Sequence, residues 1–383
     1  MGLAPFGIDN QKMPLAFDPK IGEFIHEVPG LADTEDCNQI RRLYEGYFSA
    51  NSYPFVPLER AKMDTAMLMY YANFAASVQG CLDRTIVNLA AYLKEQFSSV
   101  NLIISGGVAL NCTANGKLDR SGLFKNIFAH PGSNDAGCCI GAALQAYASL
   151  GHFRDEPPER MPIAYYGKEY PEDRIKLSLI NANYDVSEAA APKVADLLAQ
   201  NKIVAWYQGG CEFGPRALGH RSLLANPATR DMLYRMNGVK EREKWRPLSP
   251  VVLAERYREI FEDENPQNLA SFMLKTVKIK DSWRRKIPAL VHVDGTSRPQ
   301  TLDPEQNAAL HEILMAFYKL TGLPLLINTS FNGKGQPIIE TPRQALEFLE
   351  NTLNFRMAAR LRREMPELGW LGETCSLLSM TIA

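Results

Sequence analysis

The feature that most constrains the fold is a strand, a glycine turn and a helix that follow one another twice in the first half of the chain. Val100–Ile104 is a short apolar run that predicts a buried strand, and it ends in a Ser-Gly-Gly turn before a helix predicted from about Asn111. Phe128–Ala129 predicts a second strand, which leads into a turn at residues 130–135 and a helix of small residues over 136–150. This repeat predicts an α/β fold.

The length of the chain predicts two domains. At 383 residues it exceeds what a single hydrophobic core normally organises. Charged residues and prolines gather at residues 153–162, which is typical of a linker, and we place the boundary there. The predicted organisation is a first domain over 1–160, a second over 161–353 and a tail over 354–383.

Further elements follow from the spacing of apolar residues. Between residues 66 and 97 the helical spacing runs too long for one ordinary helix, which predicts two helices that meet near Gly80. In the second half, the same patterns predict helices over 189–200, 304–320 and 342–349 and strands over 202–207 and 323–327. Both halves are therefore predicted to be mixed α/β.

Composition excludes several functional classes. The net charge of −1 supplies no general attraction to nucleic acid or to a membrane surface, so we expect no nucleic-acid or membrane partner. No apolar stretch approaches the roughly 20 residues of a membrane helix, and the first residues lack the pattern of a signal peptide. The seven cysteines show no CxxC pairing, which argues against a disulfide framework and a structural zinc site. A cytoplasmic location is expected.

The two glycine turns are candidate ligand loops. After the first strand, Gly106 and Gly107 let the backbone approach a ligand closely, and the following helix offers free N–H groups to an anion; a plain structural turn is the alternative. In the second turn Asp135 stands at a predicted helix start. Its carboxylate is suited either to capping that helix or to ligating a cation.

A third loop, residues 209–222, combines many glycines with two arginines and a histidine, His220, and such loops suit phosphate. Arg216, Arg246 and Arg298 are candidates to converge on one phosphate, because guanidinium groups match its oxygens bidentately. Alternatively they are scattered surface arginines, which is the interpretation favoured for the charge run 240–246 taken alone. Walker A, HExxH, GxSxG and GxGxxG motifs are absent from the sequence.

Five segments, in this order, resemble the O-carbamoyltransferases of antibiotic biosynthesis and nodulation-factor decoration. They are Met1–Gly7, Ser105–Cys112, Gly214–Ser222, Lys244–Pro250 and Ile327–Asn332. The resemblance covers about residues 1–350. It implies the second half of an actin-like ATPase (Kae1-like) domain, followed by a YrdC-like α/β domain.

The resemblance also implies a reaction and a set of site residues. The YrdC-like domain would use carbamoyl phosphate and ATP to form carbamoyl-adenylate, and the Kae1-like domain would transfer the carbamoyl group to a hydroxyl of a small-molecule acceptor. By the same resemblance Arg216, Arg246, Arg298 and Asn328 would hold carbamoyl phosphate. Gly106, Gly107 and Asn111 would contact the nucleotide, and Asp135 would ligate a divalent metal, Fe2+ being the expected ion.

The sequence departs from the family pattern at both ends. The family's first portion, with its histidine metal ligands and the acceptor-side base, would precede Met1. The tail from about Asn354 does not resemble the family's closing strand and suggests an altered reading frame. We therefore expect this chain alone to bind carbamoyl phosphate without carbamoylating an acceptor.

Three functional hypotheses stand at this point. The first is a carbamoyltransferase, whether its N-terminal half is part of the protein or supplied in trans by a separate chain, and a homodimer is left open. The second is a non-catalytic remnant that binds carbamoyl phosphate or nucleotide. The third is a threonylcarbamoyl-type tRNA-modifying enzyme, which the net charge of −1 disfavours because it predicts a basic face.

Overall fold

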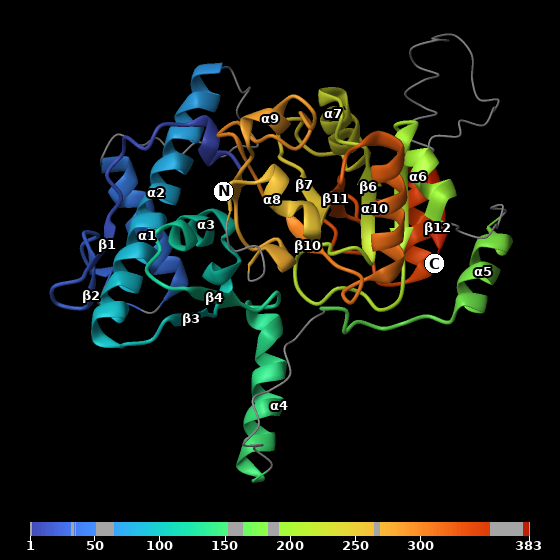
Figure 1. The fold of residues 1–383 in the computed structure, drawn as a ribbon. Helices are drawn as coiled ribbons and strands as arrows, with labels where there is room; N and C mark the ends of the chain where they lie inside the picture. Colours follow the sequence, from blue (N-terminus) through green and yellow to red (C-terminus); the bar gives the residue numbers. More distant parts are fainter. Residues whose placement is uncertain are drawn as a thin grey trace. The chain divides into compact units, whose positions relative to one another are not determined.

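A computed structural model describes residues 2–31, 34, 36–50, 65–151, 164–182, 191–263, 269–352 and 378–382. The chain forms two compact units, drawn in Figure 1. Unit 1 comprises residues 1–102 and 113–127, and unit 2 comprises residues 103–112 and 128–383. Helices and strands alternate in the structure, so the predicted α/β class is confirmed. The predicted linker 153–162 lies outside the described residues, and the predicted domain boundary stays a prediction.

Unit 1 is built around one long helix. It contains a short 3-10 helix η1 (Ala4–Phe6), an antiparallel hairpin of β1 (Leu15–Asp18) and β2 (Glu23–His26), and the helices α1 (Cys37–Ala50), α2 (Thr65–Gln96) and α3 (Cys112–Arg120). The N-terminal segment packs closely on α2. A side chain at Gly7 would meet the carbonyl oxygen of Ala72 at 2.0 Å, and the backbone N–H of Ile8 donates to the Asn73 side chain at 2.8 Å.

The prediction of two helices meeting near Gly80 is wrong, because α2 is continuous over 32 residues. The glycine serves a close contact instead. A Cβ at Gly80 would lie 2.0 Å from Oδ2 of Asp9, the carboxylate that pairs with Arg84 at 2.5 Å. The helix therefore keeps a glycine where the N-terminal segment crosses it.

The two predicted strands before the glycine turns are present as β3 (Asn101–Ile104) and β4 (Asn126–Ala129), which form a two-stranded sheet. Asn126 bonds Asn101 through their side chains at 2.8 Å, and both residues begin their strands. The strands therefore run in the same direction, and the turns leave the same end. The predicted burial of the first strand is wrong: β3 alternates exposed and half-buried residues, and Ile103 is 75% exposed.

Short 3-10 helices follow both turns. They are η3 (Gly107–Leu110), which leads into α3, and η4 (Asp135–Gly137), which leads into α4 (Cys138–Ser149). The helices predicted from about Asn111 and over 136–150 are thus confirmed with shifted starts.

Unit 2 contains a six-stranded mixed sheet. Its strand order is β10-β7-β11-β6-β5-β12, where β5 is Ile203–Tyr207, β6 is Arg221–Ala225, β7 is Ser249–Leu253, β10 is Gln300–Leu302, β11 is Leu325–Ser330 and β12 is Leu378–Ile382. β10 runs parallel to β7 and β12 parallel to β5, whereas the other neighbours are antiparallel. Every residue of β5, β6 and β7 is buried, so both faces of the central sheet are covered.

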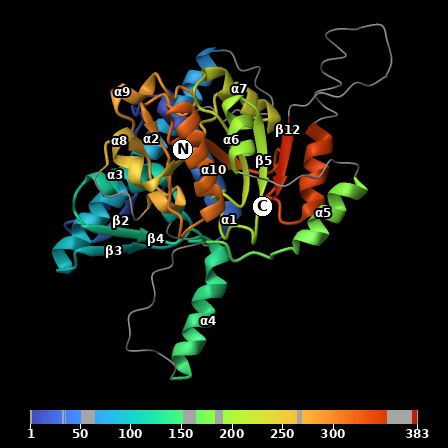
Figure 2. The ribbon, with the colours of Figure 1, turned by 45° about the vertical axis from the view of Figure 1, so that its right-hand side comes forward.

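Two helices, α6 (Ala191–Ala199) and α10 (Ala308–Thr321), pack side by side against the sheet, as Figure 2 shows. α10 buries Leu310, Ile313, Leu314 and Phe317, which lie on one helical face. It begins at residue 308 rather than at the predicted 304, because the Asn307 side chain accepts from the Leu310 N–H at 3.0 Å and caps the helix there.

Unit 2 contains several further helices and strands. They are α5 (Glu172–Asn181), α7 (Arg230–Val239), η5 (Ala254–Arg256), α8 (Tyr257–Ile260), η6 (Ala270–Phe272), α9 (Asp281–Arg284), the paired β8 (Val277–Lys278) and β9 (Thr296–Ser297), and a helix over 342–352. In the tail, residues 378–382 form β12, which pairs with β5 at the edge of the sheet.

Candidate functional site

Polar side chains from three adjacent strands lie on one face of the central sheet. Asn328 in β11 stands directly opposite Ser249 in β7, and Gln300 in β10 stands opposite Val251. Opposite residues and residues two apart on a strand point to the same face, so Asn328, Ser249 and Gln300 share it. All three are nearly completely buried, at 1%, 4% and 2% exposed. A row of buried polar side chains that meets on one face of the sheet marks this face as a candidate site.

The row holds one of the predicted arginines. Arg298 follows β9, and its Nε donates to Oγ of Ser249 at 3.0 Å. Next to it, Oγ of the fully buried Ser297 has no hydrogen-bond partner among the described residues. The structure thus places Arg298 beside Asn328.

Arg216 lies close to Arg298. Burial, and after it the positive charge of Arg298, lower the pKa of Arg216 to about 10. Its Nη2 donates to the Leu110 carbonyl at 3.2 Å, while its buried Nε has no hydrogen-bond partner among the described residues. The side chain of Asn328 donates to the carbonyl of Ala217, the residue after Arg216, at 3.3 Å. Arg216, Arg298 and Asn328 are therefore brought together.

The loop that carries Arg216 is folded around a buried carboxylate. Oε1 of Glu212 accepts the backbone N–H groups of Leu218, His220 and Arg221 at 2.9, 2.9 and 3.0 Å. His220 is packed within the same loop, stacked on the Tyr165 ring at 3.5 Å, with Nδ1 2.8 Å from the Gly210 carbonyl. Burial lowers the pKa of His220, which favours a neutral imidazole.

This loop also contacts the second glycine turn. A Cβ at Gly214, whose φ is +108°, would meet the Pro131 carbonyl oxygen at 2.3 Å, and a Cβ at Gly132 would meet the Phe213 ring at 2.5 Å. Together with the bond from Arg216 to Leu110, these contacts join the loops at 105–111, 130–135 and 209–221. Glycine is needed at both positions because no side chain fits.

Two further cations belong to the site, and the sequence did not single them out. Lys240 directly follows α7 and is only 5% exposed. Its Nζ donates to the carbonyl and, at 3.1 Å, to Oγ of Ser330. It also donates to the carbonyl and Oδ1 of Asn332, at 3.1 and 2.5 Å. Burial, and then the charge of Arg242, lower the pKa of Lys240 to about 7. The interpretation of 240–246 as a solvated surface run is therefore wrong at its first residue.

Arg242 is the second added cation. Burial, then the charges of Arg246 and Arg298, lower its pKa to about 10, which places these three arginines near one another. Nε of Arg242 donates to Oδ1 of Asn237 at 2.6 Å, while its buried Nη2 has no hydrogen-bond partner in the described part of the chain. Arg246 lies at the rim, half exposed and paired with Glu243 at 2.6 Å.

The charge balance of this arrangement is one-sided. Within the described ranges no carboxylate forms an ion pair with Arg216, Arg242, Arg298 or Lys240. Like charges brought together in a poorly solvated place are costly unless an anion joins them. We call these four residues with Asn328 the cation cluster. Its chemistry suits a small, multiply charged anion such as a phosphate.

The residues expected to contact nucleotide lie on the first glycine turn. Gly106 has a φ of +86°, and a Cβ at Gly106 or Gly107 would meet nothing within 4 Å, so there is open space above both. Asn111 directly follows η3, and its N–H donates to the Val108 carbonyl at 2.9 Å. The bond from Arg216 to Leu110 places this turn beside the cation cluster.

Asp135 is exposed in the first turn of η4. Neither η4 nor α4 has a side-chain cap, so the capping interpretation finds no support at these helices. Among the described residues no group of three or more His, Cys, Asp and Glu side chains is arranged to hold a metal ion. One exposed carboxylate is not a metal site, and these residues do not fit the expected iron by themselves.

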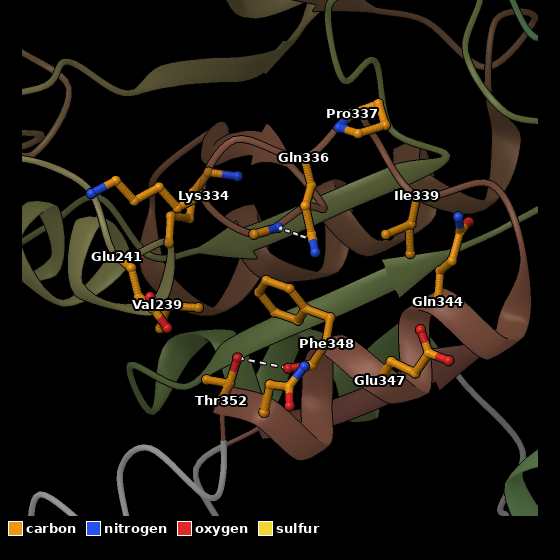
Figure 3. A pocket seen from close by; sticks show the side chains of 13 residues that line it. Val239, Glu241, Lys334, Gln336, Pro337, Ile339, Gln344, Glu347, Phe348 and Thr352 are labelled. Atoms are coloured by element: carbon orange, nitrogen blue, oxygen red, sulfur yellow. Dashed lines mark hydrogen bonds between the residues drawn. The ribbon is translucent and has the colours of Figure 1, made fainter.

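A cavity of about 430 Å³ opens beside Lys240, and Figure 3 shows it. The Phe348 ring lies in the middle of this view, between Gln336 and Thr352, and the charged side chains around it include Lys334 and Glu347. The volume is in the range of small-molecule sites. Since Lys240 lines the cavity and also adjoins Arg242, the cavity neighbours the cation cluster.

Two models of known protein families match this chain. Residues 47–144 match the family model described as carbamoyltransferase N-terminus, and residues 195–359 match that described as carbamoyltransferase C-terminus. The chain belongs to the carbamoyltransferase family. The two matches follow each other in the order in which the family has them, and the second contains the whole cation cluster.

Relatives of this carbamoyltransferase-family chain include nodulation proteins. It is 34% identical over 340 residues to nodulation protein NolO of Bradyrhizobium diazoefficiens, covering 84% of this chain and 62% of NolO. It is 39% identical over 282 residues to nodulation protein NolNO of Sinorhizobium fredii, covering 72% of this chain and 41% of that protein. The chain thus spans between two fifths and two thirds of the length of these relatives.

A solved structure of HypF from T. kodakarensis is similar over 44% of this chain and 20% of its own, with a TM-score of 0.32 and 16% identity. A likeness at this level is too remote to assign any property. Within the described residues, no helix has the length and apolar character needed to cross a membrane.

Proposed function

We propose that the cation cluster binds carbamoyl phosphate. The observation that carries this proposal is a group of poorly solvated cations without carboxylate partners, in which Nε of Arg216 and Nη2 of Arg242 have no acceptor within the described residues. A phosphoryl group supplies several anionic oxygens in the geometry that guanidinium groups bind. Arg246, at the rim, completes the set that the sequence predicted.

The reaction that this binding serves is carbamoyl transfer. In the proposed sequence water cleaves carbamoyl phosphate to carbamate and phosphate, and a carbamate oxygen then attacks the α-phosphorus of ATP, which releases pyrophosphate and gives carbamoyl-adenylate. An acceptor hydroxyl of a small molecule attacks the carbamoyl carbon, AMP leaves, and the hydroxyl proton goes to a base. The arginines stabilise the negative charge on the phosphoryl oxygens, which is the contribution such groups make to phosphoryl chemistry.

For the nucleotide, we propose two neighbouring regions. The glycine turn with Gly106, Gly107 and Asn111 leaves space for a phosphate to approach the backbone, and the cavity beside Lys240 has room for a small polar ligand. Asp135 remains a proposed contact for a metal brought in with the nucleotide.

Calorimetric titration with carbamoyl phosphate at low ionic strength tests the binding proposal. We expect Arg216→Gln and Arg298→Gln each to weaken the affinity by at least about 30-fold, because each removes one charged partner of a desolvated anion. The matched control is Arg343→Gln, whose side chain is 87% exposed and should not matter. If the unaltered chain binds no carbamoyl phosphate, or if Arg343→Gln weakens binding as much as the site variants, the assignment is wrong.

Turnover is followed separately. The chain is incubated with carbamoyl phosphate, ATP, a ferrous salt and a panel of hydroxylated acceptors, and phosphate, pyrophosphate and carbamoylated product are each measured. Formation of carbamoylated product supports the full transferase. Binding with neither pyrophosphate nor product would instead favour a non-catalytic carbamoyl-phosphate-binding protein.

A further inference from the structure

The side-chain amide of Asn328, a member of the cation cluster, has one buried acceptor atom without a donor. Its Nδ2 donates to Oε1 of Gln300 at 2.8 Å and to the Ala217 carbonyl at 3.3 Å. Its Oδ1 is buried and has no hydrogen-bond partner among the described residues, although Asn328 is only 1% exposed. A buried amide oxygen without a donor is costly, which points to a ligand that supplies the donor.

The orientation of this amide is fixed by the protein. Nε2 of Gln300 donates to the Leu218 carbonyl at 2.6 Å, so Oε1 of Gln300 must face Asn328. Rotating Gln300 by half a turn would set its oxygen against the Leu218 carbonyl, and rotating Asn328 would set Oδ1 against the Ala217 carbonyl. A carbonyl oxygen cannot donate, so both alternatives oppose two acceptors. The backbone of residues 217–218 thus determines which atom Asn328 offers.

Asn328 is close to two of the arginines that would hold a phosphate. Asn328 stands opposite Ser249, the residue that holds Arg298, and bonds the carbonyl next to Arg216. A phosphate held by these arginines would therefore lie near the Asn328 side chain. Carbamoyl phosphate carries its hydrogen-bond donors on the carbamoyl NH2 group. Acetyl phosphate has a methyl group of similar size in that place, and inorganic phosphate has neither group.

We propose that Asn328 Oδ1 accepts a hydrogen bond from the carbamoyl NH2 group, and that Gln300 is the positioning residue that keeps this oxygen turned toward the ligand. This inference rests on the proposed function and adds a determinant of specificity to it. The site then selects carbamoyl phosphate over acyl phosphates that lack an N–H donor, because those leave Oδ1 unsatisfied. The expected preference over acetyl phosphate is about 10- to 100-fold.

The test is the ratio of dissociation constants for freshly dissolved carbamoyl phosphate and acetyl phosphate, with inorganic phosphate as the reference anion. Three variants of the chain are titrated by calorimetry. Asn328→Leu removes the acceptor in a side chain of similar size, and Gln300→Met removes the group that orients it. The exposed Asn181→Leu on α5 is the matched control. In the unaltered chain the dissociation constant for acetyl phosphate should exceed that for carbamoyl phosphate. We expect both site variants to bring the two constants to within about threefold of each other, while the dissociation constant for inorganic phosphate changes by less than about threefold.

Comparing the three anions separates a loss of recognition from a loss of folding, since a purely structural defect would weaken the binding of all three anions together. The inference is overturned if the unaltered chain binds acetyl phosphate as tightly as carbamoyl phosphate, which needs no variant. Retention of the full preference in Asn328→Leu would overturn it as well. Binding of inorganic phosphate without a preference leaves the anion site intact and refutes only this inference, whereas no binding of any of the three anions refutes the proposed function itself.

Discussion

Removal of the Glu212 carboxylate should unfold the loop that carries Arg216. Oε1 of this residue accepts three backbone N–H groups at 2.9 to 3.0 Å, and the residue is 6% exposed. A hydrogen bond to a charged group contributes about 1.5–3 kcal/mol, and a buried N–H left unpaired costs a similar amount. Because water enters the space left by Glu212→Ala, we expect a loss of about 3–5 kcal/mol rather than the full sum.

Urea and thermal denaturation measure this change. In a unit of this size a loss of about 3–5 kcal/mol lowers the melting temperature by roughly 10 °C. Glu212→Gln keeps an oxygen for the same three N–H groups and loses only the charge, so it should cost about 1–2 kcal/mol. Glu347→Ala, whose half-exposed side chain pairs with Arg343, is the control and should change stability by less than about 0.5 kcal/mol. Equal stability of Glu212→Ala and Glu212→Gln would refute the reasoning.

Two further predictions concern pH and a glycine contact. The pKa of Lys240 is lowered to about 7, so its ammonium loses its proton as pH rises above 7. The affinity for carbamoyl phosphate should then fall by up to about tenfold per pH unit between pH 7.5 and 9. Lys240→Met should abolish this pH dependence. The ligand itself is fully ionised there, since the second phosphate pKa is about 6, and an equal slope in Lys240→Met would contradict the assignment. Gly80→Ala should destabilise unit 1 because the new Cβ would meet Asp9, whereas Gly46→Ala on the exposed face of α1 should stabilise by about 0.5–1 kcal/mol, both judged by thermal denaturation. Stabilisation by both substitutions would show that Asp9 moves aside without cost.

The spacing of apolar residues predicted part of the fold, and Gly80 shows where this prediction failed. The strands and helices with clear apolar periodicity, such as β5, α6 and α10, lie close to their expected places because burial of one face follows the spacing. Gly80 misled the prediction, because a glycine in a helical pattern signals a break or a close contact equally well. Only the position of Asp9, 71 residues away in sequence, distinguishes the two.

At the candidate site, the sequence motifs pointed to Arg216, Arg246 and Arg298 but not to the residues that surround them. Lys240 and Arg242 read as part of a solvated charge run, since composition does not show that the run folds back on itself. The signal was the nearby Asn237, whose Nδ2 donates to the Lys244 and Arg246 carbonyls at 3.0 and 2.9 Å and whose Oδ1 holds Arg242. A buried asparagine at a helix end, just before a charge run, can fold that run inward by satisfying its backbone.

The loop that carries Arg216 lies in the same unit as the first glycine turn. Residues 103–112 and 128–151 belong by their contacts to unit 2, which also contains the cation cluster. Arg216 has one nitrogen bound to the Leu110 carbonyl and another, Nε, without a partner among the described residues. An anion that binds Nε must share this guanidinium with the turn that contains Gly106 and Gly107. Occupation of the cluster and the position of the proposed nucleotide turn are therefore linked through a single side chain, so that the two proposed ligands would bind to neighbouring parts of one unit.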